Sequence, residues 1–170
     1  MNQALKKILI KSKKQAFSEI IGNNTSKQKG EGYDFCELKE YEYGEDVKNI
    51  DWVISAKMQK PNQYLQNIKI VNLLGGSMFF GSKRFKQDII CELSSAIAFI
   101  STKQGDPFAS YIANESLQLC TKKSKRVFNV NFMSEQLYNY NVIGKSINYP
   151  HITKELFKAI NHKSIIFLIG

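Results

Sequence analysis

The sequence predicts an α/β fold with a mostly parallel sheet, preceded by a small β-rich appendage and a basic N-terminal helix. From residue 66 onward, short apolar segments of strand length alternate with longer segments of helical periodicity, which is the pattern of βαβ units. A hydrophobic content of 43% in 170 residues is enough to bury a core. Charge is unevenly spread, because residues 1–30 hold seven lysines and one acid, whereas residues 31–51 hold eight acids and two lysines. These observations divide the chain into residues 1–21, 22–65 and 66–170.

Residues 1–21 are predicted to form one amphipathic helix. Apolar residues recur at helical spacing, and most lysines fall on the other side. The apolar set is Leu5, Ile8, Leu9, Ala16, Phe17, Ile20 and Ile21. We expect this face to pack on the rest of the protein.

Residues 22–65 are predicted to be a linker followed by an acidic, β-rich region. The linker, residues 22–32, has three glycines and no apolar anchor. Residues 33–65 are rich in aromatic and acidic residues, and Tyr43-Gly44-Glu45-Asp46 is typical of a turn between two short extended segments.

The remaining residues, 66–170, are expected to form the α/β layers. Predicted strands cover residues 68–74, 108–113 and 164–169, with a short hairpin return at 116–120. Predicted helices cover residues 83–103, 124–140 and 153–161. The first of these helices carries Phe85, Ile89, Leu93, Ala96, Ile97 and Ile100 on one face, which we expect to be its core face, and Gly105 closes it.

Only four strands can be counted, and the last would lie beside the first with nothing after it. An apolar strand at a sheet edge is a template for aggregation unless something covers it. We therefore expect either a fragment of a longer protein or a homo-oligomer that protects this edge.

The segment GEGYDFCELKEYEYGEDVKNIDWVISAKMQKP, residues 30–61, resembles the signature of the domain of unknown function 58 (DUF58) family. Three family arginines are lysines here, Lys39, Lys48 and Lys57, and a lysine cannot make the two parallel hydrogen bonds of an arginine. The resemblance implies an interaction surface formed by Glu37, Lys39, Tyr41, Asp46, Lys48, Asp51, Trp52 and Lys57.

The same resemblance implies a von Willebrand factor A-like, Rossmann-like fold whose first strand ends in D-x-S-x-S. In that motif a carboxylate and two hydroxyls bind a divalent cation, with a threonine and an aspartate from later loops. Here Leu73 stands at the aspartate position, Gly75 at the first serine and Ser77 at the second, and Thr153 is a candidate for the threonine. Because magnesium requires oxygen ligands, we expect a degenerate site with no metal and no cofactor.

The function expected from this resemblance is a non-enzymatic interaction or adaptor module that works with a MoxR-type AAA+ ATPase in assembling or maturing other complexes. The alternative is a nucleic-acid-binding protein that uses the lysine-rich N-terminal helix, although that helix lacks arginine and has few aromatic residues. A degenerate hydrolase has no acid–base pair to support it. A phosphate loop is excluded by Ser82, which stands where its lysine is required.

The sequence also predicts a cytoplasmic protein with no membrane span. No apolar run approaches the roughly 18–20 residues needed to cross a bilayer. The start of the chain interleaves lysines with apolar residues, unlike a secretory signal. Cys36, Cys91 and Cys120 suggest neither a disulfide framework nor a zinc motif, so we expect them to be reduced.

Overall fold

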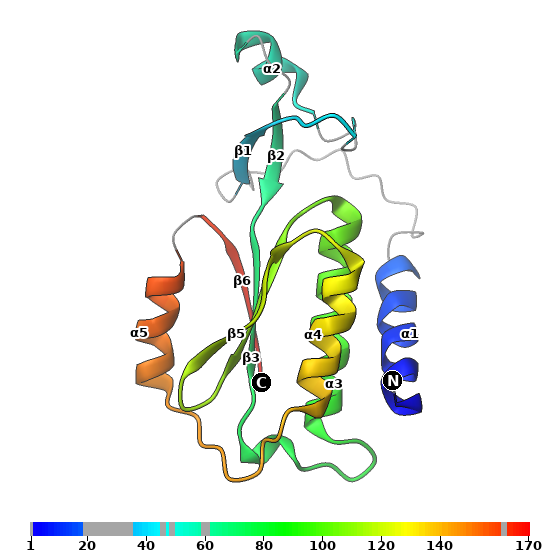
Figure 1. Ribbon diagram of the computed structural model, residues 1–170, viewed down its shortest axis with the longest axis vertical. Helices are drawn as coiled ribbons and strands as arrows, with labels where there is room; N and C mark the ends of the chain where they lie inside the picture. Colours follow the sequence, from blue (N-terminus) through cyan, green and yellow to red (C-terminus); the bar gives the residue numbers. More distant parts are fainter. Residues whose placement is uncertain (1, 19–35, 45–46, 48–49, 59–61, 161–162) are drawn as a thin grey trace.

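The computed structural model describes residues 2–18, 36–44, 47, 50–58, 62–160 and 163–170 (Figure 1). The N-terminal part contains α1 (Gln3–Ser18), β1 (Cys36–Glu40), α2 (Trp52–Met58) and β2 (Asn62–Gln66). The body continues with β3 (Ile68–Leu73), the 3-10 turn η3 (Gly76–Met78), α3 (Lys86–Gln104), β4 (Phe108–Ala113), β5 (Leu117–Ser124), α4 (Val127–Asn139), α5 (Tyr149–Ala159) and β6 (Ile165–Ile169). This order confirms an α/β fold.

The main sheet has four strands in the order β5-β4-β3-β6. β3 pairs in parallel with both β4 and β6, as expected for a last strand beside the first, but β4 pairs with β5 in antiparallel fashion. The prediction of a mostly parallel sheet is therefore wrong, and the sheet is mixed. Only Asn114, Glu115 and Ser116 join β4 to β5, which is too short for the crossover that a parallel pair needs.

Helices cover the sheet on both faces (Figure 1). The larger core lies on the side of α1, α3 and α4. It includes Ile70 of β3, Phe108 of β4 and Met133 of α4, which are fully buried. The smaller core lies under α5 and joins Val71, Leu73, Ala113 and Ile152. Alternation of side chains along β3 places Ile70 and Val71 in different cores.

α3 presents only part of the expected face to the core, since Ile97 and Ile100 are half-buried and pack against the larger core. Phe85, Ile89 and Leu93 are exposed, by 42%, 44% and 49%. The buried side combines Ile90 and Ala98 with small or polar side chains, namely Cys91, Ser94, Ser95 and Ser101. Helical periodicity identifies an apolar stripe, but it does not show which side of the helix meets the neighbouring elements. The small residues on the buried side allow α1 and α4 to pack closely on α3.

The N-terminal helix docks on the body through its apolar face, as expected. Leu5, Ile8, Leu9 and Ala16 belong to the larger core cluster. All five lysines of α1 lie at exposed positions. The predicted linker at 22–32 and the predicted last helical residues Ile20 and Ile21 lie outside the described residues.

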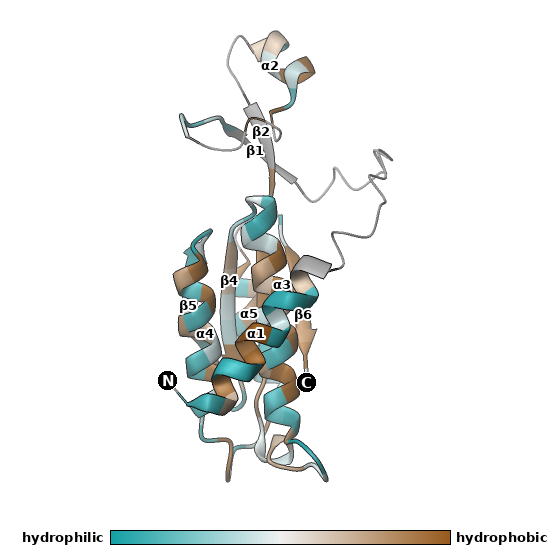
Figure 2. Cartoon of the chain, turned by 90° about the vertical axis from the view of Figure 1, so that its right-hand side faces the viewer, coloured by the Kyte–Doolittle hydropathy of each residue, from teal (hydrophilic) through white to brown (hydrophobic). Residues whose placement is uncertain are grey.

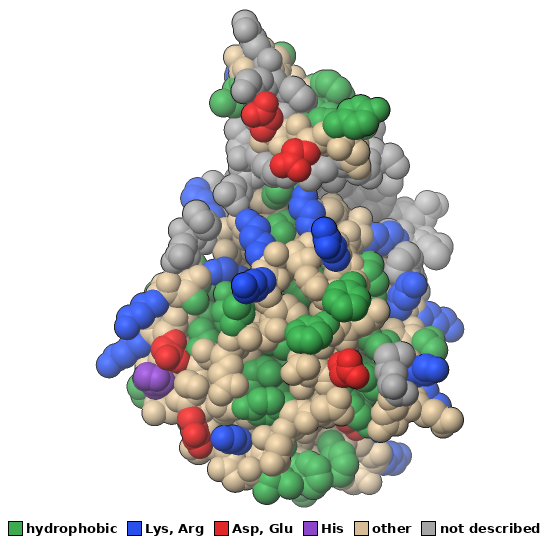
Figure 3. Space-filling model, viewed as in Figure 1, with side chains coloured by type: hydrophobic (Ala, Val, Ile, Leu, Met, Phe, Trp, Pro, Cys, Tyr) green, Lys and Arg blue, Asp and Glu red, His purple; other side chains and the backbone are tan. Residues whose placement is uncertain are grey.

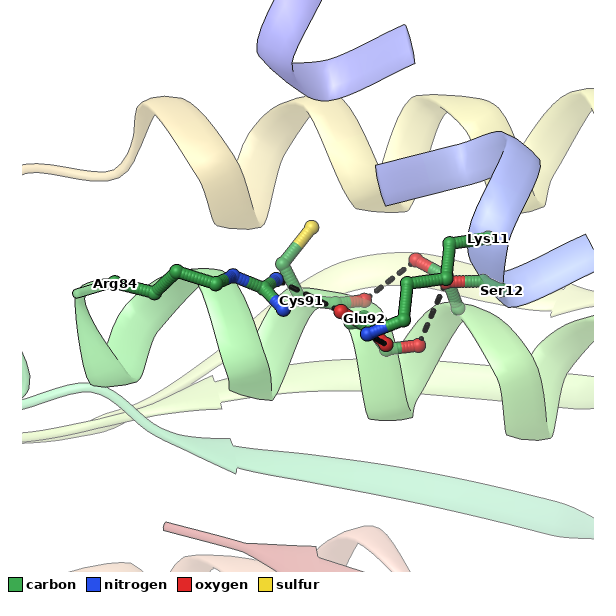
Figure 4. A network of polar contacts seen from close by, with 6 residues as sticks. Lys11, Ser12, Arg84, Cys91 and Glu92 are labelled. Carbon is green, nitrogen blue, oxygen red and sulfur yellow. Dashed lines mark hydrogen bonds and ion pairs between the residues drawn. The ribbon is translucent and has the colours of Figure 1, made fainter. Parts of the chain in front are cut away.

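A polar network joins α1 to α3 (Figure 4). The carboxylate of Glu92, which is only 8% exposed, forms ion pairs with Lys11 at 2.6 Å and with Arg84 at 2.7 Å. The Ser12 hydroxyl donates to the main-chain oxygen of Glu92 at 2.9 Å. Burial alone would raise the pKa of Glu92, but hydrogen bonds from Lys11 and Arg84 outweigh it and lower the pKa.

Replacing Glu92 with glutamine is expected to destabilise the protein by about 1–2 kcal/mol at pH 7, a modest cost because water can solvate the half-exposed Lys11 and Arg84. A group whose pKa is lowered by folding stabilises the protein above its unfolded pKa and loses that contribution as the pH falls through its folded pKa. The difference between wild type and variant should therefore shrink from about pH 5 to about pH 3. Urea unfolding across this pH range measures the difference in stability, and Glu135→Gln, at an exposed position on α4, is the control. An equal difference at both ends of the range would contradict the assignment.

The appendage is a two-stranded antiparallel sheet with a helix between its strands. β1 pairs with β2 from Cys36 opposite Gln66 to Glu40 opposite Asn62. The predicted turn is present at Tyr43 and Gly44, where Gly44 has a φ of 99°, and its other two residues lie outside the described part. Helix α2 was not predicted. β2 runs into β3, so the appendage projects from the end of the sheet where β3 begins (Figure 1).

β6 forms one edge of the four-stranded sheet and is apolar along its whole length (Figure 2). Ile166 and Phe167 are each 37% exposed, and Leu168 is 60% exposed. The expected homo-oligomer through this edge stays a prediction, which the mass of the chain in solution would test.

Within the described part of the chain, every helix is too short or too polar to cross a bilayer. Cys91 and Cys120 are free thiols, buried and half-buried respectively.

Candidate functional site

The turn that follows β3 is packed with apolar side chains. Leu73 and Leu74 are buried, and Leu73 lies in the smaller core with Ile152 of α5. Leu73, which the resemblance aligns with a cation-binding carboxylate, therefore contributes hydrocarbon to the core. Gly75 and Gly76 then lead into the short 3-10 turn η3.

The loop between α4 and α5 closes over these glycines. The Gly76 N–H donates to the Lys145 oxygen at 2.8 Å, and the Asn148 N–H ties the loop to the Asn114 oxygen at 2.9 Å. A Cβ atom on Gly75 would lie 2.9 Å from Cγ1 of Ile147. Glycine fits position 75 without strain, whereas a side chain there would force Ile147 to shift.

Replacing Gly75 with alanine is expected to lower the free energy of unfolding by about 1–2 kcal/mol, because Ile147 must move away from the new methyl group. Gly76→Ala is the matched control, since its Cβ would meet nothing closer than 3.5 Å. Thermal or urea unfolding of both variants measures the contrast. Shortening Ile147 to valine in the Gly75→Ala background should recover part of the loss. Equal stability of the two alanine variants would refute this packing.

The two remaining hydroxyls of the predicted degenerate site differ in their surroundings. Ser77 is exposed in η3. Thr153 was expected at the start of its helix, but it lies inside α5. The helix begins earlier because Asn148 caps it and Pro150 occupies its first turn. The Thr153 hydroxyl donates to the Tyr149 oxygen at 2.8 Å. In the described chain, no group of three or more histidine, cysteine or acidic side chains could hold a metal ion.

A buried polar network lies directly before the turn and was missed by sequence reasoning. Asn72 is fully buried in β3, and its amide nitrogen donates to the Ser110 hydroxyl at 3.1 Å and to the Tyr111 oxygen at 2.9 Å. The Ser94 hydroxyl donates to the amide oxygen of the Asn72 side chain at 2.5 Å. One side chain thus joins β3, β4 and α3. A lone asparagine inside the apolar segment IKIVNLL was the available signal.

Two of the residues expected to form the interaction surface, Trp52 and Lys57, lie on α2, and a third, Asp51, directly precedes it. The Asp51 carboxylate caps the helix by accepting from the N–H groups of Val53 at 2.9 Å and Ile54 at 3.0 Å. Trp52 is 64% exposed, and Lys57 is also exposed. Asp51 therefore has a structural role, while Trp52 is presented to solvent.

The other expected interaction residues are only partly described. Glu37 and Lys39 lie on β1 opposite Leu65 and Gln63 of β2. Tyr41 follows β1 and is half-buried. Asp46 and Lys48 lie outside the described residues. Among the described residues, the expected set falls into two groups, one on and beside β1 and one on and beside α2.

A basic surface at the end of the body nearest the appendage was also missed. Figure 3 shows lysine and arginine side chains gathered there, below the acidic side chains of the appendage. The run at the end of β5 and start of α4 supplies Lys122, Lys123, Lys125 and Arg126. The sequence TKKSKR was a visible signal, because four cationic positions in so short a span are unusual for an edge strand.

Comparison with known proteins gives a family and no more. Searches of curated proteins and of solved structures found no match. A family model described as "Protein of unknown function DUF58" matches residues 37–170, from β1 through α2 and the β3 turn to the end of β6. Because this match covers well over half of the sequence and includes residues 37–61 of the signature segment, the chain belongs to the DUF58 family.

Proposed function

We propose that this protein is a non-enzymatic interaction module that binds a partner protein through the exposed apolar surface of α2. The observation that carries the proposal is Trp52, held at the start of a capped helix with most of its surface in water. Tryptophan buries a large area on binding and is enriched among the residues that dominate interface energies.

The neighbours of Trp52 extend the same surface. Val53 and Met58 on α2 are 62% and 56% exposed, and Val47, just before the helix, is 53% exposed. An apolar cluster of this kind on an ordered helix is typical of a protein-binding site. The Asp51 cap supports the proposal because it orders the helix before a partner arrives, which reduces the entropy lost on binding.

The partner we propose is an AAA+ ATPase of the MoxR type, on the basis of the DUF58 signature at residues 30–61. The von Willebrand A-like fold with a degenerate cation site belongs to the same proposal. It is supported by the hydrocarbon at Leu73 and by the filled space at Gly75. Binding of the purified chain to the purified ATPase, measured by isothermal titration calorimetry, tests the proposal. No saturable heat with or without nucleotide would count against it.

The second candidate is nucleic-acid binding by the lysines of α1. One observation favours it, since docking buries the apolar face of α1 and leaves Lys6, Lys7 and Lys14 at exposed positions. Titration with labelled RNA and DNA at two salt concentrations would test it, because phosphate contacts make the affinity fall steeply as salt rises.

A further inference from the structure

Two loops lie side by side at the end of the body opposite the appendage (Figure 1). One leads from β3 into α3 and the other joins α4 to α5; they are residues 74–85 and 140–148. The Gly76 N–H of the first loop donates to the Lys145 oxygen of the second at 2.8 Å. The buried Gln87 amide, at the start of α3, donates to the Tyr140 oxygen at 2.8 Å. These bonds join the two loops into one surface, which we call the loop tip.

The loop tip presents large apolar side chains to solvent. Phe79 and Phe85 are exposed, although their rings stack with centroids 4.5 Å apart. Phe80 is 72% exposed, and Ile143 of the second loop is 65% exposed. Figure 3 shows hydrophobic side chains gathered at this lower end of the molecule. Exposed apolar groups that cluster in this way mark surfaces that bind a protein or a membrane.

The backbone of the first loop is held in place while the Phe80 side chain stays in water. The Lys86 N–H donates to the Phe80 oxygen at 3.1 Å, which closes the loop at the start of α3. The Arg84 guanidinium pairs with the Glu92 carboxylate at 2.7 Å and so ties the same loop to α3. An ordered loop loses less conformational entropy when its side chains become buried against a partner.

Positive charge surrounds the apolar side chains of the loop tip. Neither loop contains an aspartate or a glutamate, and the residue after the first loop is a further lysine. The cationic residues are Lys83, Arg84, Lys86 and Lys145. The β4–β5 turn beside the second loop adds one exposed acid, Glu115, so the positive charge remains in excess. Apolar side chains among cations match the acyl boundary and the negative headgroups of an anionic bilayer.

Other roles account for only part of this surface. Packing within the protein explains Phe79 and Phe85, which stack on each other, but Phe80 and Ile143 remain largely in solvent. Protein-binding sites centre on tryptophan, tyrosine or arginine, whereas the loop tip presents phenylalanine and isoleucine, and its one arginine is already paired with Glu92. The observations therefore favour a lipid surface over a second protein site.

We propose that the loop tip binds the surface of an anionic membrane. Phe80 and Ile143 enter the boundary between the headgroups and the acyl chains, and the lysines of the loop tip lie among the negative headgroups. The loop tip and α2 lie at opposite ends of the molecule, so this inference is independent of the proposed partner binding (Figure 1).

Co-sedimentation of the full chain with lipid vesicles tests the proposal. The chain should bind saturably to vesicles of phosphatidylcholine and phosphatidylglycerol in equal parts. It should bind vesicles of phosphatidylcholine alone roughly a hundredfold more weakly, because three lysines lose their attraction to the surface. Phe80→Ala should weaken binding to the anionic vesicles by at least roughly tenfold, since the ring no longer leaves water. Lys83→Gln should weaken it by roughly fivefold.

Matched controls come from the far end of α5. Phe157, 74% exposed, and Lys158, also exposed, lie near the C-terminal end of that helix. Phe157→Ala and Lys158→Gln should therefore leave vesicle binding unchanged, as should Trp52→Ala on α2. Thermal unfolding of each variant confirms that it folds.

Three results would overturn the proposal. The first is equal binding to both kinds of vesicle, or to neither. The second is a loss for Phe157→Ala or Trp52→Ala as large as that for Phe80→Ala. The third is unchanged vesicle binding by Phe80→Ala together with a weaker calorimetric affinity for the ATPase, which would make the loop tip a protein contact.

Discussion

Replacing Asn72 with alanine is expected to lower the free energy of unfolding by about 3 kcal/mol or more. The substitution leaves the hydroxyls of Ser94 and Ser110 without the amide that joins them, in a region with no access to solvent. A buried polar group that loses its partner costs about 1–3 kcal/mol, and two or more such groups are affected here. The volume left by the amide adds to the loss.

Urea unfolding of the purified variant measures this effect. Asn131→Ala, at an exposed position on α4, is the control and should change stability by less than about 0.5 kcal/mol. If Asn72→Ala were as stable as that control, the network would contribute little and the account of how β3, β4 and α3 are held together would be wrong.

Replacing Trp52 with alanine is expected to weaken binding to the MoxR-type ATPase by roughly 30-fold or more, corresponding to about 2 kcal/mol or more. The free energy of unfolding should change by less than about 0.5 kcal/mol, because the indole is mostly exposed and contributes little to the core. Calorimetric titration and urea unfolding on the same preparations separate the two effects.

The control for Trp52 is another exposed aromatic residue. Phe157 on α5 is 74% exposed, so Phe157→Ala removes a comparable apolar group far along the chain from the signature. It should leave the affinity for the ATPase unchanged. Equal losses for the two variants would mean that general surface hydrophobicity, and not the α2 surface, determines binding.

The strands of the body could be predicted from the sequence because they are short, apolar and bounded by turns. Predicted and observed bounds coincide for β4, residues 108–113. The last strand, β6, pairs with β3, the first strand of the body, as predicted. The hairpin return predicted at 116–120 is confirmed by the antiparallel pairing of β5 with β4, although the strand continues to Ser124. The buried side of α3 could not be fully derived, because it depends on neighbours distant in sequence. α2 was missed because its seven residues are too few for a periodic signal and because its cap, Asp51, lies in a strongly acidic segment.

The candidate site was only partly accessible to the same reasoning. The absence of ligand oxygens at Leu73 and Gly75 can be read from the sequence. That Ile147 fills the space beside Gly75 cannot, because 72 residues separate the two positions and only the path of the α4–α5 loop brings them together. Asn72 looked like an interruption of a strand, whereas its three hydrogen bonds require the strand, its neighbour and a helix to be in place.

The central claim is that the chain acts by protein contact and holds no cation where β3 meets its turn. Calorimetric titration of the purified chain with manganese tests it most directly, since Mn²⁺ accepts the same oxygen ligands as Mg²⁺. The expected result is no saturable heat at millimolar metal for wild type and for Ser77→Ala alike, because a single exposed hydroxyl cannot compensate the dehydration of the ion. Stoichiometric uptake by wild type that Ser77→Ala abolishes would contradict the claim.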